Sequence, residues 1–512
     1  MKHLFTSSLL LLAFLLPTTA FAYGIEVDGI YYRINGDEAI VSSCANYVTG
    51  DIHIPRTISY GDATYIVTSI GERAFEEAPN ITSVEIPNSV TSIERCAFYG
   101  CYSLTAIVIP RSVVTIGEHA FVSNPSLSSI TVESGNPKYD SRNHCNAIIE
   151  TATNTLIVGC QNTIIPNTVT AIGDDAFCWS GLTSIVIPNS VISIGNNVFQ
   201  GSELTSIEIP NSVTIIGDCA FMECYHLESV TISNSVTSIG IYAFCSCQEL
   251  KNINIPSSVT SIGDWAFCNC FSLKEIIIPK TVSYIGHGIL YSCYDLISII
   301  VEEGNPNYDS RDNCNAIIET ESNTLIEGCQ NTTIPNTITR IGNEALTCTP
   351  DLSSIEIPNS VKSIGDQAFS GCLGLKNVTI GNSLTSIGIA AFSLCTSLTS
   401  VSIPNSTTSI HHQAFGSCSS LMDVYSFIEN PEKVYMGYSV FYLESEDYSG
   451  RTLHVPAGSL AAYQADENWN MYFGNIVEME TAPTVLGDVD GDGKLTINDV
   501  VTLIGLLLSS EN

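Results

Sequence analysis

The sequence predicts a repeat solenoid, a fold in which copies of one short coil stack along a single axis. The segment at residues 204–221, LTSIEIPNSVTIIGDCAF, recurs along most of the chain. Most copies follow the previous one after 22 or 23 residues, a period typical of solenoids, and two steps measure 56 residues. Aligned on Ile-Gly-x-x-Ala-Phe, the copies place thirteen apolar anchors, and we expect one turn for each: Phe75, Phe98, Phe121, Phe177, Phe199, Phe221, Phe244, Phe267, Leu290, Leu346, Phe369, Phe392 and Phe415.

One repeat is too small to fold alone. Its Leu-x-x-Ile-x-Ile segment, which ends at Ile209, has the alternation of a short strand, and Pro210 begins a turn. The Ile-Gly-Asp-x-Ala-Phe ending predicts a tight turn or a one-turn helix that returns Phe221 to the interior. Burying the apolar side chains of one repeat contributes at most about 10–20 kcal/mol, whereas ordering its backbone costs about 1–2 kcal/mol per residue. The core therefore closes only when coils with parallel strands stack on one another.

Residues 1–22 have the features of a secretory signal peptide. Lys2 lies near the start, an apolar run covers residues 9–16, and Ala20-Phe21-Ala22 precedes the expected cleavage before Tyr23. The apolar run is too short to span a bilayer, so we expect no transmembrane segment after cleavage. The protein is therefore expected to be secreted or displayed at the cell surface.

Residues 23–63 differ from the repeats and predict a β-rich N-terminal cap. The segment GIEVDGIYYRI at residues 24–34 has the pattern of a strand, a turn and a second strand. An exposed solenoid end needs such a cover, because its strand edge and its core are otherwise open to water.

The solenoid is expected over residues 64–420. Its repeats resemble the BspA-like leucine-rich repeat family, whose pattern is Leu-x-x-Ile-x-Ile-Pro-x-x-Val-x-x-Ile-Gly-x-x-Ala-Phe. Leu290 and Leu346 take the place of the anchor phenylalanine in two copies. Glu94 and His411 take the place of the glycine in two others. The resemblance implies a leucine-rich solenoid and adhesion of the cell surface to host or bacterial proteins.

Two inserts, at about residues 133–162 and 302–331, account for the long steps. They are nearly identical and lie 169 residues apart, which indicates duplication of a whole block. Each contains two short strands around a four-residue turn, a hairpin signal. Pairing about that turn places Cys145 opposite Cys160 and Cys314 opposite Cys329, at separations suited to disulfides. Both a bridge and a pair of free thiols remain open in each copy.

The other cysteines follow the repeat. The chain has 19 Cys, and eight of them lie three residues after an anchor: Cys101, Cys224, Cys247, Cys270, Cys293, Cys372, Cys395 and Cys418. We interpret these eight as a column of small buried side chains rather than as a disulfide framework.

Alternate strand residues point outward and define a candidate binding face. Six of them mark it: Glu85, Glu208, Glu275, Ile277, Ile300 and Glu356. A neighbouring outward column is mostly Ser. The two isoleucines suit either a partner contact or ordinary strand composition. Acids lie several coils apart and bases are almost absent, so we expect no enzyme activity.

Net charge limits the partners. The formal net charge of −34 disfavours nucleic acid and anionic membranes. It suits calcium, cationic partners and solubility.

Residues 421–480 lose the repeat register and are rich in aromatic residues, including Tyr463, Trp469 and Tyr472. Such a cluster is either the core of a C-terminal cap or a platform for sugar binding.

A calcium loop is expected after a short linker, within residues 481–512. Residues 488–499, DVDGDGKLTIND, match the spacing of an EF-hand loop, with Gly493 at the sharp bend. The predicted Ca²⁺ ligands are Asp488, Asp490, Asp492, the backbone carbonyl of Lys494, Thr496 and Asp499. A fortuitous acidic turn is the alternative.

A helix should follow the loop over residues 497–508. The combination resembles half of a type I dockerin, and this resemblance implies a cohesin-like partner bound through residues 488–508. That family carries two loop–helix repeats, and this chain shows one. The broad apolar stripe of the helix needs a cover, either the aromatic cap or a partner.

Three functions follow from these expectations. The first is an exported, non-enzymatic solenoid that adheres to an extracellular protein on a host or bacterial surface, or to a glycan, with a calcium-ordered docking tail. The alternative is a scaffold subunit of a cohesin–dockerin assembly that binds polysaccharide. The third is a carbohydrate-active enzyme.

Overall fold

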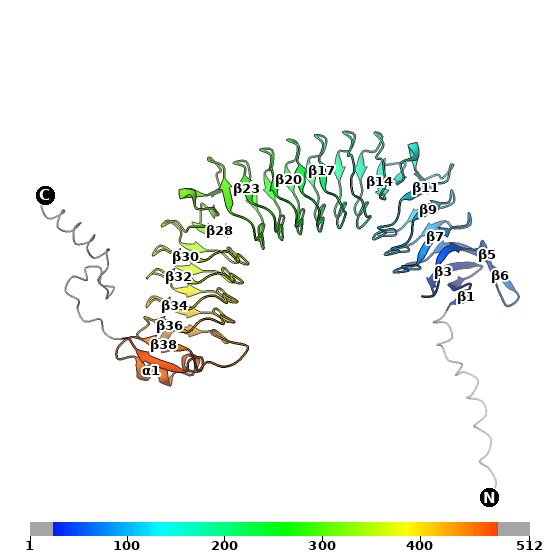
Figure 1. Cartoon of the computed structure of the whole chain (residues 1–512). Coiled ribbons are helices and arrows are strands. Elements are labelled where there is room, and N and C mark those ends of the chain that lie inside the picture. Colours follow the sequence, from blue (N-terminus) through cyan, green and yellow to red (C-terminus); the bar gives the residue numbers. More distant parts are fainter. Residues whose placement is uncertain (1–23, 480–512) are drawn as a thin grey trace, which may run out of the picture. The chain divides into compact units, whose positions relative to one another are not determined.

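The computed structural model describes residues 24–479, and these residues form the predicted solenoid of stacked parallel strands with little helix. The expected leader at residues 1–22 and the expected calcium loop at residues 488–499 lie outside the described residues. The chain divides into two compact units, of which Tyr308 ends the first and Asp309 begins the second. Each unit is a stack of coils (Figure 1).

In the first unit, most regular coils contribute one strand to an outward-facing ladder, here called the face ladder. Its strands are β4 (Gly50–His53), β7 (Ile81–Glu85), β9 (Ala106–Ile109), β11 (Ser129–Val132), β17 (Ser206–Glu208), β19 (Ser229–Thr231), β21 (Asn252–Ile253), β23 (Glu275–Ile278) and β25 (Ser298–Val301). Neighbours pair in parallel from β4 to β11 and from β17 to β25, and Ile277 lies beside Ile300. Equivalent residues of successive repeats are therefore neighbours in space.

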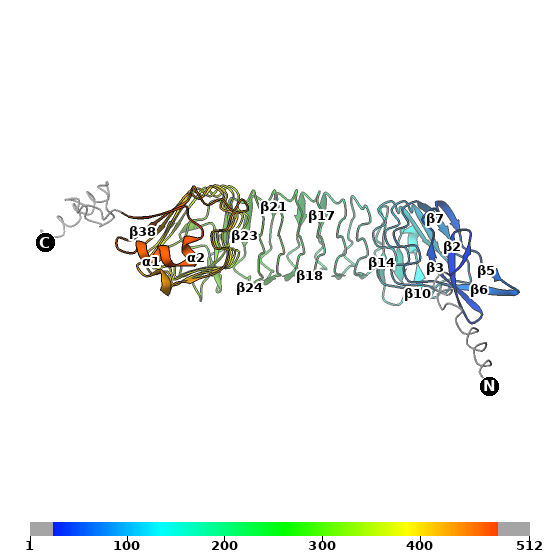
Figure 2. The ribbon, with the colours of Figure 1, turned by 90° about the horizontal axis from the view of Figure 1, so that it is seen from below.

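A second, shorter ladder runs along the opposite side of the stack. Its strands are β8 (Ser92–Ile93), β10 (Thr115–Ile116), β15 (Ala171–Ile172), β16 (Ser193–Ile194), β18 (Ile215–Ile216), β20 (Ser238–Ile239), β22 (Ser261–Ile262) and β24 (Tyr284–Ile285). Figure 2 shows β17, β21 and β23 along one side of the coils and β18 and β24 along the other.

The start of the first unit is a β-rich cap. It contains β1 (Ile25–Val27), β2 (Ile30–Asn35), β3 (Glu38–Cys44), β5 (Thr57–Tyr60) and β6 (Ala63–Ile70). Strands β1, β2 and β3 pair antiparallel, and β6 joins the cap to β8 in parallel. The cap thus covers the edge of the first coil.

The first insert is a hairpin built into the stack. It comprises β12 (Tyr139–Asp140), the 3₁₀ helix η1 (Arg142–His144), β13 (Ile148–Glu150) and β14 (Thr155–Val158). Strand β14 pairs in parallel with β15, which returns the chain to the repeat.

The second unit repeats this plan. After β26 (Tyr308–Asp309), which spans the unit boundary, come η2 (Arg311–Asn313), β27 (Ala316–Glu319) and β28 (Thr324–Gly328). Its face ladder is β30 (Ser354–Ile357), β32 (Asn377–Ile380), β34 (Ser400–Ile403), β36 (Asp423–Ser426), β38 (Thr452–Val455) and β39 (Asn475–Glu478). The opposite ladder is β29 (Arg340–Ile341), β31 (Ser363–Ile364), β33 (Ser386–Ile387), β35 (Ser409–Ile410) and β37 (Tyr435–Met436).

The described chain has about 18 turns rather than the thirteen counted from the anchors. The anchor alignment omits coils that lack the Ile-Gly-x-x-Ala-Phe ending. Phe441 is one such case, since its ring stacks on Phe415 at 5.3 Å although Val440 replaces the alanine. Strands β38 and β39 then extend the face ladder beyond the last anchor.

The anchors form stacked columns of buried rings. In the first unit, ring centroids are 5.1–5.3 Å apart from Phe75 to Phe121, and 5.2–5.7 Å apart from Phe177 to Phe267. In the second unit the column runs from Phe369 to Phe441. No stacking joins Phe121 to Phe177 in the described structure, because the insert separates their coils and brings Gly159 against the ring of Phe177.

The C-terminal coils close on an aromatic cluster and a buried arginine. The helices α1 (Leu460–Ala465) and α2 (Glu467–Asn470) bring in Tyr463 and Trp469, both fully buried. Arg451 is 2% exposed and donates to the carbonyl oxygens of Cys418, Leu421 and Phe441. This aromatic cluster is the core of the final coils, as expected for a cap.

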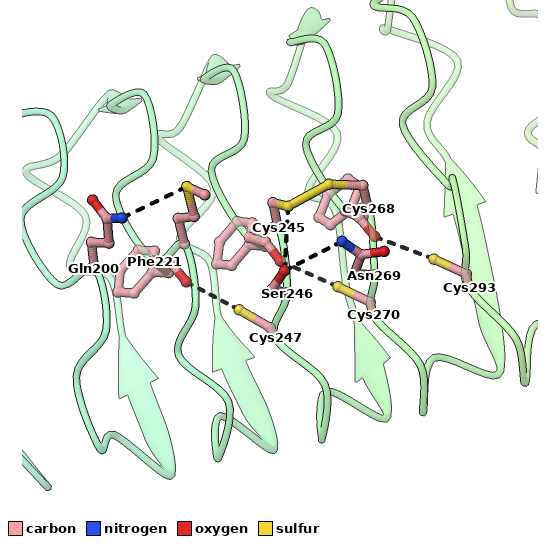
Figure 3. The surroundings of a disulfide bond; sticks show 12 residues. Gln200, Phe221, Cys245, Ser246, Cys247, Cys268, Asn269, Cys270 and Cys293 are labelled. Carbon is pink, nitrogen blue, oxygen red and sulfur yellow. Dashed lines mark hydrogen bonds between the residues drawn. A yellow bond between two sulfur atoms is a disulfide. The ribbon is translucent and has the colours of Figure 1, made fainter.

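The column of eight cysteines lies beside the anchors. Each thiol donates to the carbonyl oxygen of the previous anchor, with Sγ–O distances of 3.0–3.2 Å. Figure 3 shows this for Cys247, Cys270 and Cys293. The column holds adjacent coils together through hydrogen bonds.

A disulfide joins two coils at another repeat position, which sequence reasoning missed. Cys245 and Cys268 each follow an anchor directly, and their Cα atoms are 4.7 Å apart (Figure 3). Two cysteines at the same position of consecutive repeats are a signal for such a bridge, since equivalent residues are neighbours along the stack.

Burial makes five thiols of the column unreactive in the folded protein. It raises the pKa of Cys101, Cys224, Cys270, Cys372 and Cys418 from 9.0 to about 12. We expect iodoacetamide at pH 8 to leave these thiols unmodified in the native protein and to modify them after unfolding, as read by mass spectrometry. Native labelling as fast as in the unfolded chain would contradict the buried column.

The same shifts predict a loss of stability at alkaline pH. A raised folded-state pKa favours the neutral thiol, so its contribution is fully present below pH 9.0 and is lost as the pH rises toward about 12. Urea unfolding should therefore give a lower free energy of unfolding at pH 10.5 than at pH 8. Replacing Cys270 by Ala should reduce that difference.

The expected pairing of Cys145 with Cys160 is wrong in register. A bulge between Ile148 and Ile149 shifts the hairpin by one residue, so that Ile148 pairs with Val158. Cys160 consequently lies against Asn146. Its thiol donates a hydrogen bond to the carbonyl oxygen of Asn146, with an Sγ–O distance of 3.2 Å. Both cysteines are free thiols in this structure.

The second insert repeats this correction. A bulge between Ile317 and Ile318 shifts β27 against β28. Cys314 and Cys329 are free thiols, and Cys329 donates to the carbonyl oxygen of Asn315. The unbroken register assumed about each turn is the reason that both expected pairs failed.

Candidate functional site

The outward side chains of the face ladder form an exposed surface in each unit. Residues pointing inward, such as Ile207 and Ile276, are buried, whereas their neighbours Glu208 and Ile277 are exposed. This alternation is the direct consequence of strand geometry. Because neighbours are in register, one column of the face is rich in Ser and Thr, as in Ser206 beside Ser229.

The six candidate residues all lie on this surface, and three of them gather. Glu275 and Ile277 lie on β23, and Ile300 lies beside Ile277 on β25. Ile277 and Ile300 are each 41% exposed and form a small apolar spot. Glu85 on β7 and Glu208 on β17 lie on strands separated from this spot, and Glu356 lies on β30 of the second unit.

The face of the first unit begins with a polar group near the cap. His53 on β4 contacts Glu85 on β7, with 2.9 Å between Nδ1 and Oε2. The hydroxyls of Ser83 and Thr82 donate to Asp51, and these hydrogen bonds lower the pKa of its carboxyl. These groups are exposed, so they contribute little to stability and remain available to a partner.

A groove of about 830 Å³ interrupts the face between the segment at residues 183–187 and β17. It is lined by Ser184, Val186, Pro188, Ser206, Glu208 and Thr231, among others. Val186 is 83% exposed and Ile164, in the preceding coil, is 73% exposed. The groove therefore holds Val186, the most exposed large hydrophobic side chain of residues 24–479, beside the acid Glu208.

The ladder is unpaired at the groove. Strand β17 is the first strand of its sheet, and no hydrogen bond in residues 24–479 joins it to residues 183–187. Ile185 is only half-buried, although its equivalent Ile207 is 5% exposed. In the second unit, the strand equivalent to residues 183–187 is β30, and the strand equivalent to β17 is β32. These two strands pair in register, so the same step is closed there.

Sequence reasoning missed this groove, but a signal marks it. The aligned repeats place five residues between the anchor and the first leucine or isoleucine of the next strand, as from Phe221 to Leu227. The two coils beside the groove have one fewer, from Phe177 to Leu182 and from Phe199 to Leu204. These shortened corners produce the two steps of 22 residues.

A second hollow lies where the first insert breaks the anchor column. It has a volume of about 490 Å³ and is lined by Glu118, His119, Lys138, Tyr139, Glu150 and Asp175, among others. His119 contacts Asp175 across the break at 3.4 Å, and Lys138 contacts Glu150 at 3.7 Å. Each base is engaged by an acid, and the pKa of Asp175 is raised by burial, which the nearby His119 opposes.

This hollow brings together acidic and basic side chains, whereas the sequence predicted acids several coils apart and almost no bases. The signal is the long step itself, because an insert between Phe121 and Phe177 must displace side chains from the regular stack. No group of three or more His, Cys, Asp and Glu residues within residues 24–479 is placed to hold a metal ion. The expected calcium ligands at residues 488–499 lie beyond this part of the chain.

None of the helices formed within residues 24–479 has the length and apolar character needed to cross a bilayer.

Comparison with known families identifies the repeats. The BspA type leucine rich repeat region matches residues 68–146, 157–240, 214–317 and 316–445. These matches include most of the chain and all of the regular coils of both units. No curated protein matches the chain.

Several solved structures are similar. A leucine rich cell surface protein from Faecalibacterium prausnitzii is 22% identical, over 89% of this chain and 94% of its own, with a TM-score of 0.43. A leucine-rich repeat protein from Bacteroides ovatus is 24% identical, over 89% and 100%, with a TM-score of 0.45. The pneumococcal vaccine antigen PcpA is 18% identical, over 89% and 98%, with a TM-score of 0.39.

Proposed function

The chain belongs to the BspA-type leucine-rich repeat family, and from that premise we propose that it is an exported, non-enzymatic solenoid that binds a protein ligand at or beyond the cell surface. The observation that carries the proposal is the exposed face, where outward side chains repeat in register from coil to coil. Such a surface suits many small contacts with a large ligand rather than chemistry at one point.

The electrostatics of the face support a ligand with basic groups. The chain carries 52 acidic residues against 18 basic ones. Glu208, Glu275 and Glu356 are exposed on the face, where they attract and orient a cationic partner. Export is supported by the signal-peptide features of residues 1–22.

The test is capture of surface proteins by the full mature chain, with a matched pair of variants. Replacing Ile277 and Ile300 by Asp should weaken binding of a captured ligand about tenfold, because it removes the apolar spot on the face. The control is Ile389→Asp, a substitution at a residue with similar exposure, 42%, outside the strands. Equal binding by all three proteins, or release of reducing ends from a glycan panel, would contradict the proposal.

A calcium-ordered C-terminal tail is part of the proposal and rests on the sequence spacing of residues 488–499. Asp490 and Asp492 occupy positions three and five of the expected loop, where oxygen ligands are required. We expect Asp490→Ala with Asp492→Ala to abolish calcium binding measured by titration calorimetry. The control Asp351→Ala, an exposed acid elsewhere, should bind normally.

The role of the tail in attachment can be separated from ligand binding. Deleting residues 481–512 should release the protein from the cell surface while leaving ligand binding by the face intact. Calcium binding that survives the double substitution, or surface retention that survives the deletion, would contradict a docking tail.

A further inference from the structure

The groove beside β17 has the properties of a site for strand addition. A strand at the end of a sheet presents a row of unpaired N–H and C=O groups, which another extended chain can pair with. Strand β17 is such an end, since its described ladder partner is β19 and the segment at residues 183–187 does not pair with it. The open step therefore leaves backbone groups exposed on both walls of the groove.

The direction of these groups follows from the bonds that β17 does make. Ile209 donates its N–H to the carbonyl oxygen of Thr231, and the carbonyl oxygen of Thr205 accepts from Glu228. Successive residues of a strand direct their backbone groups to opposite edges. The N–H and C=O groups of Ser206 and Glu208 consequently point into the groove.

The opposite wall, at residues 183–187, offers a second set of unpaired backbone groups. No hydrogen bond within residues 24–479 involves a backbone N–H or C=O group of residues 183–187. In the second unit the corresponding residues, Ser354 to Ile357, form a ladder with β32. The comparison indicates that residues 183–187 have the sequence of a strand but make no backbone pairing.

Side chains define what an inserted strand must carry. Its inward residue would lie between Ile185 and Ile207, and would complete the burial of Ile185. Its outward residues would lie beside the carboxylate of Glu208 and the exposed side chain of Val186. A strand in which apolar residues alternate with Lys or Arg would match both the buried and the acidic side chains of the groove.

We propose that this groove binds an extended, basic peptide segment of a partner protein by β-strand addition between residues 183–187 and β17. The proposal names the ligand class for part of the proposed binding face, and so it rests on the proposed function. The strongly acidic net charge of −34 favours association with basic segments. Backbone pairing supplies affinity, and the Glu208 and Ile185 positions supply selectivity.

The first test measures binding of synthetic peptides by fluorescence anisotropy. The probe is the labelled peptide GTVKVKVTG, compared with its acidic twin GTVEVEVTG and its proline twin GTPKPKPTG. The full mature chain should bind the basic peptide at least about tenfold more tightly than either twin, because only that peptide has both the charges and the N–H groups. No binding of the basic peptide, or equal binding of all three, would overturn the proposal.

Two variants locate the binding to the groove. Ser206→Pro removes an N–H that points into the groove and breaks no ladder bond of the fold, so it should weaken peptide binding about tenfold without changing the unfolding curve. Glu208→Gln should weaken it by about threefold to tenfold through loss of the charge. The matched control is Glu356→Gln, an exposed glutamate in the same outward column on β30, whose step to β32 is paired, and it should bind like the wild type.

Hydrogen exchange keeps the test valid even where a variant fails to fold. In the wild type, the amides of Ser206 and Glu208 should exchange faster than that of Ile209, and should become protected when the basic peptide is bound. Unchanged exchange at both amides with peptide bound would overturn the site. A change in oligomeric state of the Ser206→Pro variant would instead assign the groove to a second copy of this chain, and would also count against the proposal.

The outcomes separate this inference from the proposed function. Capture of a surface ligand equally by the wild type and by Ser206→Pro, with no peptide binding, would overturn the groove assignment and leave the binding face intact. Peptide binding at the groove without any capture of surface ligands would support the site and contradict the wider function.

Discussion

Replacing Phe221 by Ala is expected to lower the free energy of unfolding of the first unit by about 4–6 kcal/mol. Phe221 is fully buried, and its ring stacks on Phe199 and Phe244 with centroid distances of 5.2 Å on both sides. The substitution leaves a cavity in the core and removes two ring contacts at once. Because each coil contacts only its neighbours, the loss also uncouples the coils on either side.

Urea unfolding followed by circular dichroism measures this effect. The control is Ile215→Ala, which truncates a large apolar side chain that is 55% exposed on β18 and should change stability by at most about 0.5 kcal/mol. Similar small losses for both variants would mean that the anchors do not form the core.

Replacing Arg451 by Met is expected to destabilise the second unit by about 3–6 kcal/mol. The guanidinium is 2% exposed and donates to three carbonyl oxygens, two of them at 2.9 Å. Methionine fills a similar volume but offers no donor, so these buried oxygens lose their partners. Burial lowers the pKa of Arg451, but its charge persists at every pH of interest.

Fluorescence of the buried Trp469 in the same unit reports this transition. Arg451→Lys should recover only part of the loss, because one ammonium group cannot reach three carbonyl oxygens in the geometry of the planar fork. The control Arg95→Met removes a half-exposed arginine that contacts Glu72 and should cost less than about 1 kcal/mol. A loss below that of the control would contradict the capping role.

The repeat made most of the fold predictable. An alignment on Ile-Gly-x-x-Ala-Phe is sufficient to place Phe221 in the core, Glu208 on the surface and Cys247 beside the previous anchor, because equivalent positions meet along the stack. The same reasoning extends to the pairing of Ile277 with Ile300. The repeat period predicts these positions because each coil has nearly the same surroundings.

Places where the period breaks were not predictable in the same way. The bulge at Ile148 and Ile149 shifted a register that the turn length alone did not determine. The open step beside β17 adjoins corners that are one residue shorter, a difference that an alignment on anchors conceals. The buried Arg451 lies beyond the last regular repeat, where no sequence pattern predicts which carbonyl oxygens need a hydrogen-bond donor. Departures from the repeat therefore carry the specific features of this chain.

The central claim is that the anchors of each unit point into one stacked core while recognition lies on the outward face. Hydroxyl-radical footprinting with mass spectrometry tests it most directly, because it measures the accessibility of individual side chains in solution. Phe221, Phe244 and Phe392, all fully buried, should remain unlabelled, whereas Tyr60 at 62% exposed and Tyr438 at 69% exposed should be oxidised rapidly. Labelling of the phenylalanines at the rates of these tyrosines would contradict the account.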